Sequence, residues 1–151
     1  MRRAQLNDGT EVTLYTPEYV KARLEEAAQT LRRLPATGCF PQGHKAQWPQ
    51  VVREFWEEWN VKGEGEKEEF ADERNRVRLS PSPAQIERMD EALMWLYYIK
   101  QPEHRMVVFA RCLGVRGGVL ARRFHVHRNT VATWYEAGLV RVANALNQGA
   151  V

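Results

Sequence analysis

The chain has 151 residues, the length of one or two small domains. Its composition, 44% hydrophobic and 27% charged, is that of a globular protein, and no apolar run is long enough to span a membrane. The segment from Met1 to Gly9 lacks the apolar core of a signal peptide, so we expect a cytoplasmic protein with no membrane partner.

The net charge of +3 hides two segments of opposite sign. Residues 54–73 hold nine acidic and two basic residues, whereas residues 100–151 hold eight basic and two acidic residues. A basic C-terminal part is what contact with nucleic-acid phosphates requires. The acidic segment reads as a solvated linker, and it would also be repelled by DNA.

The first 60 residues predict a helical region for interaction or oligomerisation. Asn7-Asp8-Gly9, between Leu6 and Val12, favours a short β-hairpin. Thr16 and Pro17 then predict the start of a helix that Pro35 stops. A second helix follows Trp48-Pro49, and we expect the two to form an antiparallel hairpin. The second helix carries a large apolar stripe that predicts a protein-binding surface, formed by Phe55, Trp56 and Trp59.

Residues 35–49 form a predicted loop, and residues 61–81 a predicted acidic linker. Cys39 and His44 lie close in the loop, but two ligands are too few for a structural zinc site. We therefore expect neither a metal nor a cofactor. Cys39 and Cys112 read as reduced thiols, although a disulfide between them stays open.

Residues 82–151 predict a helical domain. Ser82 and Pro83 predict the start of its first helix, whose last turns, from Met94 to Ile99, are apolar nearly all round. That pattern predicts burial on every side. Pro102 starts another helix, which Gly114 ends. The expected fold is therefore all-α: an N-terminal helical hairpin, an acidic linker and a C-terminal helical domain.

The segment from Gly117 to Glu136 predicts two helices joined by a short turn. Leu120, Ala121 and Phe124 share one face of the first helix, and Val131 and Trp134 resume the apolar pattern on the second. Val126, between two histidines, would point inward from the turn. The second helix continues to about Asn147, and His127 would cap its start.

This spacing resembles the helix-turn-helix of bacterial repressors and region four of bacterial sigma factors. His125 stands where that family usually has glycine with a positive φ, a conformation in which histidine is enriched among other residues. Arginine and asparagine pair with guanine and adenine edges in the major groove. The predicted DNA-binding residues, with phosphate contacts among them, are Arg116, Arg122, Arg123, His127, Arg128, Asn129, Thr130, Ala132, Thr133 and Arg141.

The order of segments across the chain is also similar to a family of uncharacterised alpha-proteobacterial and phage proteins. The matching segments include Thr16–Val20, Leu31–Pro35, Trp48-Pro49, Ile86–Glu91 and Leu146-Asn147. The resemblance implies a phage, prophage or gene-transfer setting and carries no known activity.

We therefore expect a sequence-specific transcription regulator associated with the nucleoid, as an activator or a repressor. RNA polymerase or a second subunit would bind its N-terminal half, and we expect a homo- or hetero-oligomer. The alternative is a phage terminase small subunit that recognises packaging-site DNA, although those proteins usually place the helix-turn-helix first. A protein-interaction module is a third possibility. The sequence holds no phosphate loop and no nucleophile–base pair, so we do not expect an enzyme.

Overall fold

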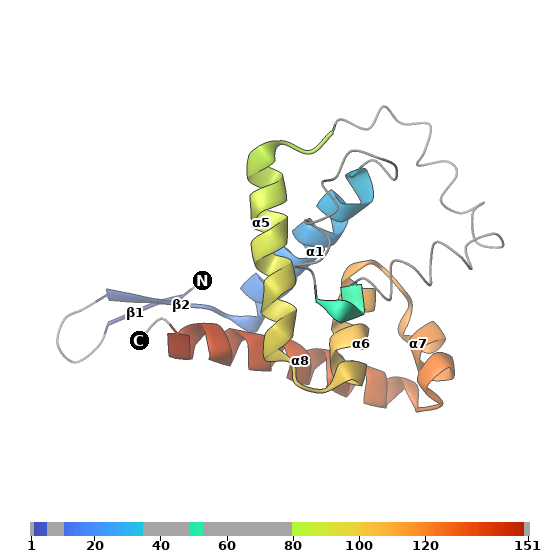
Figure 1. Cartoon of the computed structure of the whole chain (residues 1–151). Helices are drawn as coiled ribbons and strands as arrows, with labels where there is room; N and C mark the ends of the chain where they lie inside the picture. The colour runs from blue at the N-terminus through green and yellow to red at the C-terminus, as the bar shows by residue number, and fades with distance from the viewer. Residues whose placement is uncertain (1, 6–10, 35–48, 53–79, 150–151) are drawn as a thin grey trace.

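The computed structural model describes residues 2–5, 11–34, 49–52 and 80–149 (Figure 1). Five α-helices dominate these residues, which confirms the all-α class. The elements are the strands β1 (Arg2–Gln5) and β2 (Glu11–Leu14), the helices α1 (Pro17–Arg33), α5 (Pro83–Met94), α6 (Pro102–Cys112), α7 (Gly117–Phe124) and α8 (Arg128–Gly149), and the 3₁₀ helix η1 (Trp95–Tyr98).

The predicted β-hairpin is present as an antiparallel pair in which Arg2 lies opposite Leu14. The residues of its turn, 6–10, lie outside the described part of the chain. Asn147 of α8 contacts Tyr15, the residue that follows β2, and so attaches the hairpin to the helices. The backbone N–H of Tyr15 donates to Asn147 Oδ1 at 2.7 Å, and Asn147 Nδ2 donates to the Tyr15 carbonyl at 3.0 Å.

The helices begin where the sequence predicts. Thr16 caps α1 by accepting a hydrogen bond from the backbone N–H of Tyr19 at 3.3 Å. Ser82 and Gln85 form a reciprocal capping box at the start of α5, with bonds of 2.9 and 3.3 Å. Both helices, like α6, have proline in their first turn, where no N–H is needed.

Two helices, α6 and α7, end in the same way. In each, a residue with positive φ follows the helix: Gly114 at 88° and His125 at 54°. The next residue, Val115 or Val126, donates its N–H to a carbonyl five residues earlier, at 3.0 Å in both cases. This is the Schellman arrangement, which satisfies the last carbonyls of a helix. The predicted left-handed conformation of His125 is thus confirmed.

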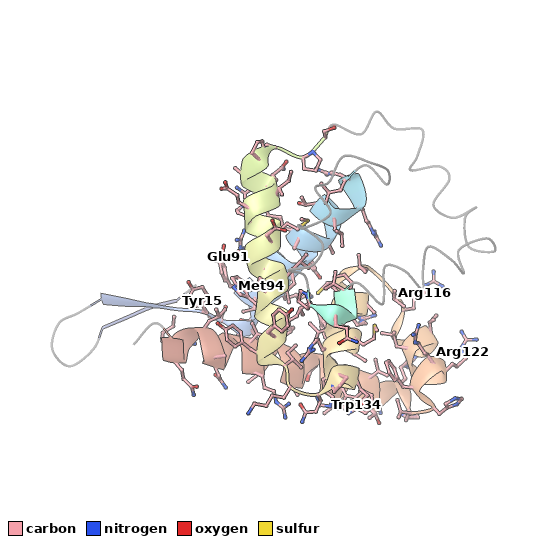
Figure 2. The ribbon with its side chains drawn as sticks, in the orientation of Figure 1. Tyr15, Glu91, Met94, Arg116, Arg122 and Trp134 are labelled. Atoms are coloured by element: carbon pink, nitrogen blue, oxygen red, sulfur yellow. The ribbon has the colours of Figure 1, made fainter. Side chains whose placement is uncertain are left out.

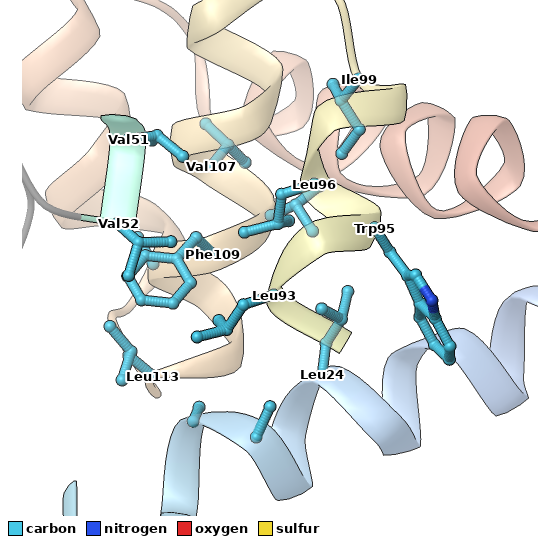
Figure 3. Close-up of a cluster of buried hydrophobic side chains, with 14 of the residues drawn as sticks. Leu24, Val51, Val52, Leu93, Trp95, Leu96, Ile99, Val107, Phe109 and Leu113 are labelled. Atoms are coloured by element: carbon cyan, nitrogen blue, oxygen red, sulfur yellow. The ribbon is translucent and has the colours of Figure 1, made fainter. Parts of the chain in front are cut away.

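The core draws on residues from both ends of the chain. Helix α8 packs against α1, α6, α7 and η1, and α1 also packs against α5 and α6. Figure 3 shows Leu93 and Leu96 facing Phe109 of α6, with Leu24 of α1 alongside. The described part of the predicted N-terminal region, chiefly α1, therefore shares one core with the predicted DNA-binding region, 82–151.

Most of the second predicted N-terminal helix lies outside the described residues, and so do Phe55, Trp56 and Trp59. Of that helix only Gln50, Val51 and Val52 are described as helical, and the two valines are buried in the core. Cys39, His44 and nearly all of the acidic linker also fall outside the described part.

The prediction that residues 94–99 are buried on every side is wrong. Trp95, Leu96 and Ile99 are buried, but Met94, Tyr97 and Tyr98 are 44%, 47% and 47% exposed. The α-helix gives way to a 3₁₀ helix at Trp95, which changes the angle between successive side chains. One side of the apolar segment, from Met94 in α5 to Tyr98 in η1, faces away from the core.

Helix α8 packs closely against α6 at Gly138. A Cβ atom added there would overlap Cγ2 of Val108 in α6 and come within 3.4 Å of Cδ1 of Ile99. Glycine is therefore required at this crossing because of the space that its neighbours occupy.

Gly138→Ala tests this close approach. Alanine favours a helix by about 1 kcal/mol over glycine, whereas overpacking a core costs about 1–3 kcal/mol. We expect a net loss in the free energy of unfolding of up to about 2 kcal/mol in urea titrations followed by circular dichroism. Gly149→Ala is the control, because no described atom lies within 4 Å of its added Cβ. A Gly138→Ala protein more stable than the wild type by the full helix preference of alanine, about 1 kcal/mol, would contradict the packing.

His125→Gly tests the turn after α7. The left-handed conformation costs a non-glycine residue about 1–2 kcal/mol, and the extra backbone entropy of glycine offsets about 0.5–1 kcal/mol of that gain. We expect His125→Gly to stabilise the protein by up to about 1 kcal/mol and His125→Val to destabilise it. Gly114→Ala, at the matching position after α6, should also destabilise it. Loss of stability in His125→Gly would mean that the imidazole makes contacts worth more than the strain.

Candidate functional site

Helix α7, the turn and the start of α8 form one packed unit. Leu120 and Ala121 of α7 are buried, and Val131 of α8 is 1% exposed. Phe124 and Trp134 are partly buried and pack against the same core, as does Val126 from the turn. Every apolar residue that the sequence assigned to the inner side of this unit therefore lies against the core.

The outer side of this unit carries the candidate site. All of the predicted DNA-binding residues are exposed except Thr130, which is partly buried. We call four of them the basic face: Arg116, Arg122, Arg123 and Arg128. Residues 116–133 contain no acidic residue. Figure 2 shows Arg116 and Arg122 together at the α7 end of the molecule.

Arg141 does not belong to this cluster. It lies thirteen residues after Arg128 on the same helix, a distance of about 20 Å along the axis. It is exposed, and its charge acts on His104 of α6. The structure therefore separates Arg141 from the basic face.

His127 caps α8, as the sequence predicts. Its Nδ1 accepts a hydrogen bond from the backbone N–H of Asn129 at 3.2 Å. In the neutral ring the proton then lies on Nε2, which leaves a donor available on the exposed histidine. The hydroxyl of Thr133 donates to the carbonyl of Asn129 at 3.0 Å, so its hydrogen is already used inside the helix.

Two side chains on the outer side differ in how they are held. The stem of Arg128 runs beside the start of α7, since a Cβ added at Gly117 would lie 3.9 Å from Arg128 Cγ. The side-chain amide of Asn129, by contrast, has no hydrogen-bond partner among the described residues. Asn129 thus presents both a donor and an acceptor to solvent.

One exposed residue on the same side was not predicted. Glu136 follows Thr133 by three residues and Asn129 by seven, so it shares their side of α8. It is the first acidic residue after the basic face. Its spacing from Asn129 and Thr133 is visible in the sequence, so its position on this side of α8 could have been predicted.

An aromatic stack supports the unit from the inner side. The His104 ring of α6 lies 5.1 Å from the Trp134 ring with an interplanar angle of 26°, and Phe124 of α7 meets Trp134 edge-on at 6.0 Å. Sequence reasoning missed His104, because thirty residues separate it from Trp134 and no local pattern joins them.

Two titratable groups near this unit have raised pKa values. Burial raises the pKa of the Cys112 thiol to about 12, so the thiol stays protonated at neutral pH. Burial also raises the pKa of Tyr135. Within the described ranges, no three His, Cys, Asp or Glu side chains are placed to hold a metal ion, and no helix is long and apolar enough to cross a membrane.

Comparison with known proteins identifies a family and no activity. The chain matches no curated protein and no solved structure. Residues 32–142, which include the whole of α5, α6 and α7, match a family described as a domain of unknown function, DUF6362. Since the match extends over more than half of the 151 residues, the chain belongs to the DUF6362 family.

Proposed function

We propose that the protein binds double-stranded DNA through a helix-turn-helix made of α7, the turn and α8, and that it acts as a sequence-specific transcription regulator. The observation that supports the proposal is the combination of two features. Two helices are joined by a left-handed turn at His125, and their outer side bears four arginines with no acid between residues 116 and 133.

In this proposal the start of α8 enters the major groove, which is wide enough to admit one α-helix. Asn129 is then the main base reader, because its unpaired amide can make the bidentate contact that adenine accepts. Ala132 and Thr133, on the same outer side, supply apolar contact for a thymine methyl group. Thr130 and His127 lie at the edge of this surface.

The basic face holds the DNA backbone. Arg116, Arg122 and Arg123 on the α7 side are suited to phosphates, which fix orientation without reading sequence. Arg122 Nε donates to the Gly118 carbonyl at 3.4 Å, which aligns its guanidinium along α7. The packing of Arg128 beside Gly117 favours a phosphate contact for Arg128 as well, in place of the base contact that its helix position suggests.

Resemblance to sigma region four favours a regulator that touches RNA polymerase, in a phage, prophage or gene-transfer setting. The N-terminal residues Phe55, Trp56 and Trp59 are the proposed contact for polymerase or a second subunit, and nucleoid association would follow from DNA binding. Activation and repression both remain compatible with this arrangement.

The first test is direct binding to a randomised pool of duplexes, followed by affinity measurements on the selected duplex as salt is varied. Four phosphate contacts predict that the logarithm of the affinity falls with the logarithm of salt concentration with a slope of about −3 to −4. Absence of binding at low salt would reject the proposal and favour a protein-interaction module. A ring-sized oligomer on a single packaging-site sequence would instead favour a terminase small subunit.

Asn129→Ala and Arg128→Ala separate base reading from phosphate contact. Asn129→Ala should reduce discrimination between the selected duplex and a scrambled one by about 1–3 kcal/mol. Arg128→Ala should weaken binding to both duplexes alike and lower the salt slope by about 1. Asn144→Ala, exposed near the far end of α8, is the matched control and should change neither. Equal losses on both duplexes for Asn129→Ala would show that Asn129 does not read a base.

A further inference from the structure

His104 joins the interior to the start of α8. It lies in the first turns of α6, and its ring stacks on Trp134 of α8 at 5.1 Å and 26°. Phe124 of α7 meets the same indole edge-on at 6.0 Å and 77°. The Trp134 ring, labelled in Figure 2, therefore contacts side chains from both α6 and α7.

Trp134 is well placed to control the outer side of α8. It follows Asn129 by five residues, less than one and a half helical turns. A stack that fixes the indole therefore also fixes the rotation of the turns that carry Asn129, Ala132 and Thr133. If the indole moves, these three side chains move with it.

The environment of His104 favours the neutral ring. Its Nδ1 is buried and has no hydrogen-bond partner in the described part of the chain. Burial lowers the pKa of His104, and the charge of Arg141 on α8 lowers it further, while Glu103 beside it on α6 acts in the opposite direction. From α7 the neighbour is the uncharged ring of Phe124.

We propose that His104 is a positioning residue for DNA recognition: its neutral ring holds the start of α8 in place through Trp134, and DNA affinity falls when the ring is protonated. The inference rests on the proposed DNA-binding function. It adds a dependence on pH that the basic face alone would not give. The sign is opposite to that of exposed histidines near phosphates, which strengthen binding when they gain charge.

The sign follows from what protonation does to the stack. An imidazolium needs hydrogen-bond partners for both N–H groups, and the buried Nδ1 has none among the described residues. The face of an indole attracts a cation, which opposes this effect. Repulsion from Arg141 and the cost of a buried N–H without a partner together outweigh that attraction. The charged ring therefore leaves the stack, and Trp134 loses its support.

The test compares the wild type with His104→Phe on the duplex selected from the randomised pool, at about pH 8 and about pH 5. The acid value lies well below the ordinary histidine pKa because the pKa of His104 is lowered. Phenylalanine keeps the stack and cannot be protonated. His125 and His127 are present in both proteins, so the difference between the two proteins isolates His104. We expect the wild type to lose at least about threefold more affinity on acidification than His104→Phe, which corresponds to half a pKa unit of coupling.

His104→Gln is the second variant. It removes the aromatic stack, so it should bind DNA more weakly than the wild type at pH 8, and His104→Phe should restore the affinity. Circular dichroism at both pH values reports whether each protein is folded. Equal acid-to-neutral affinity ratios in the wild type and His104→Phe would overturn this inference alone. Absence of DNA binding by every protein at both pH values would overturn the proposed function and this inference together.

Discussion

The close approach of α8 to α6 at Gly138 is the constraint on which the rest of the structure depends. Only glycine lets the α8 backbone come this near to Val108 and Ile99. The residues that follow on the same side, Leu139 and Val142, are then buried. The start of α8 at Arg128 is ten residues, or about three helical turns, from Gly138. Since a helix is rigid over a few turns, this contact fixes which side of α8 faces outward at its start.

Helix α8 is also held at both of its ends. At the far end Asn147 makes two hydrogen bonds to the backbone of Tyr15, and at the near end Trp134 lies between His104 and Phe124. A helix fixed in the middle and near both ends cannot easily rotate about its axis. Its exposed residues therefore keep a constant position relative to the arginines of α7, which is what a recognition surface needs.

Local signals allowed the helix limits and the turn to be predicted, and tertiary contacts explain what was missed. Thr16 and Ser82 with their prolines, Gly114 and His125 act within a few residues, so the sequence reveals them. The stack of His104 on Trp134 joins residues thirty positions apart, and the stem of Arg128 lies beside Gly117 of another helix. The exposed Tyr97 and Tyr98 depend on a change from α to 3₁₀ geometry that hydrophobicity does not encode.

Charge is segregated across the described helices in a way that stability alone does not require. On α1 and α5, Glu26 and Glu91 are paired with Arg23, and Glu26 also with Arg88, at 3.0–3.1 Å. Such pairs at the surface stabilise a fold by only about 0–1 kcal/mol. Their larger effect is to neutralise one side, while Arg116 and Arg128 form no ion pair with any described carboxylate. In the proposed DNA-binding function, these two arginines would help to orient α7 and the start of α8 toward the polyanion before contact is made.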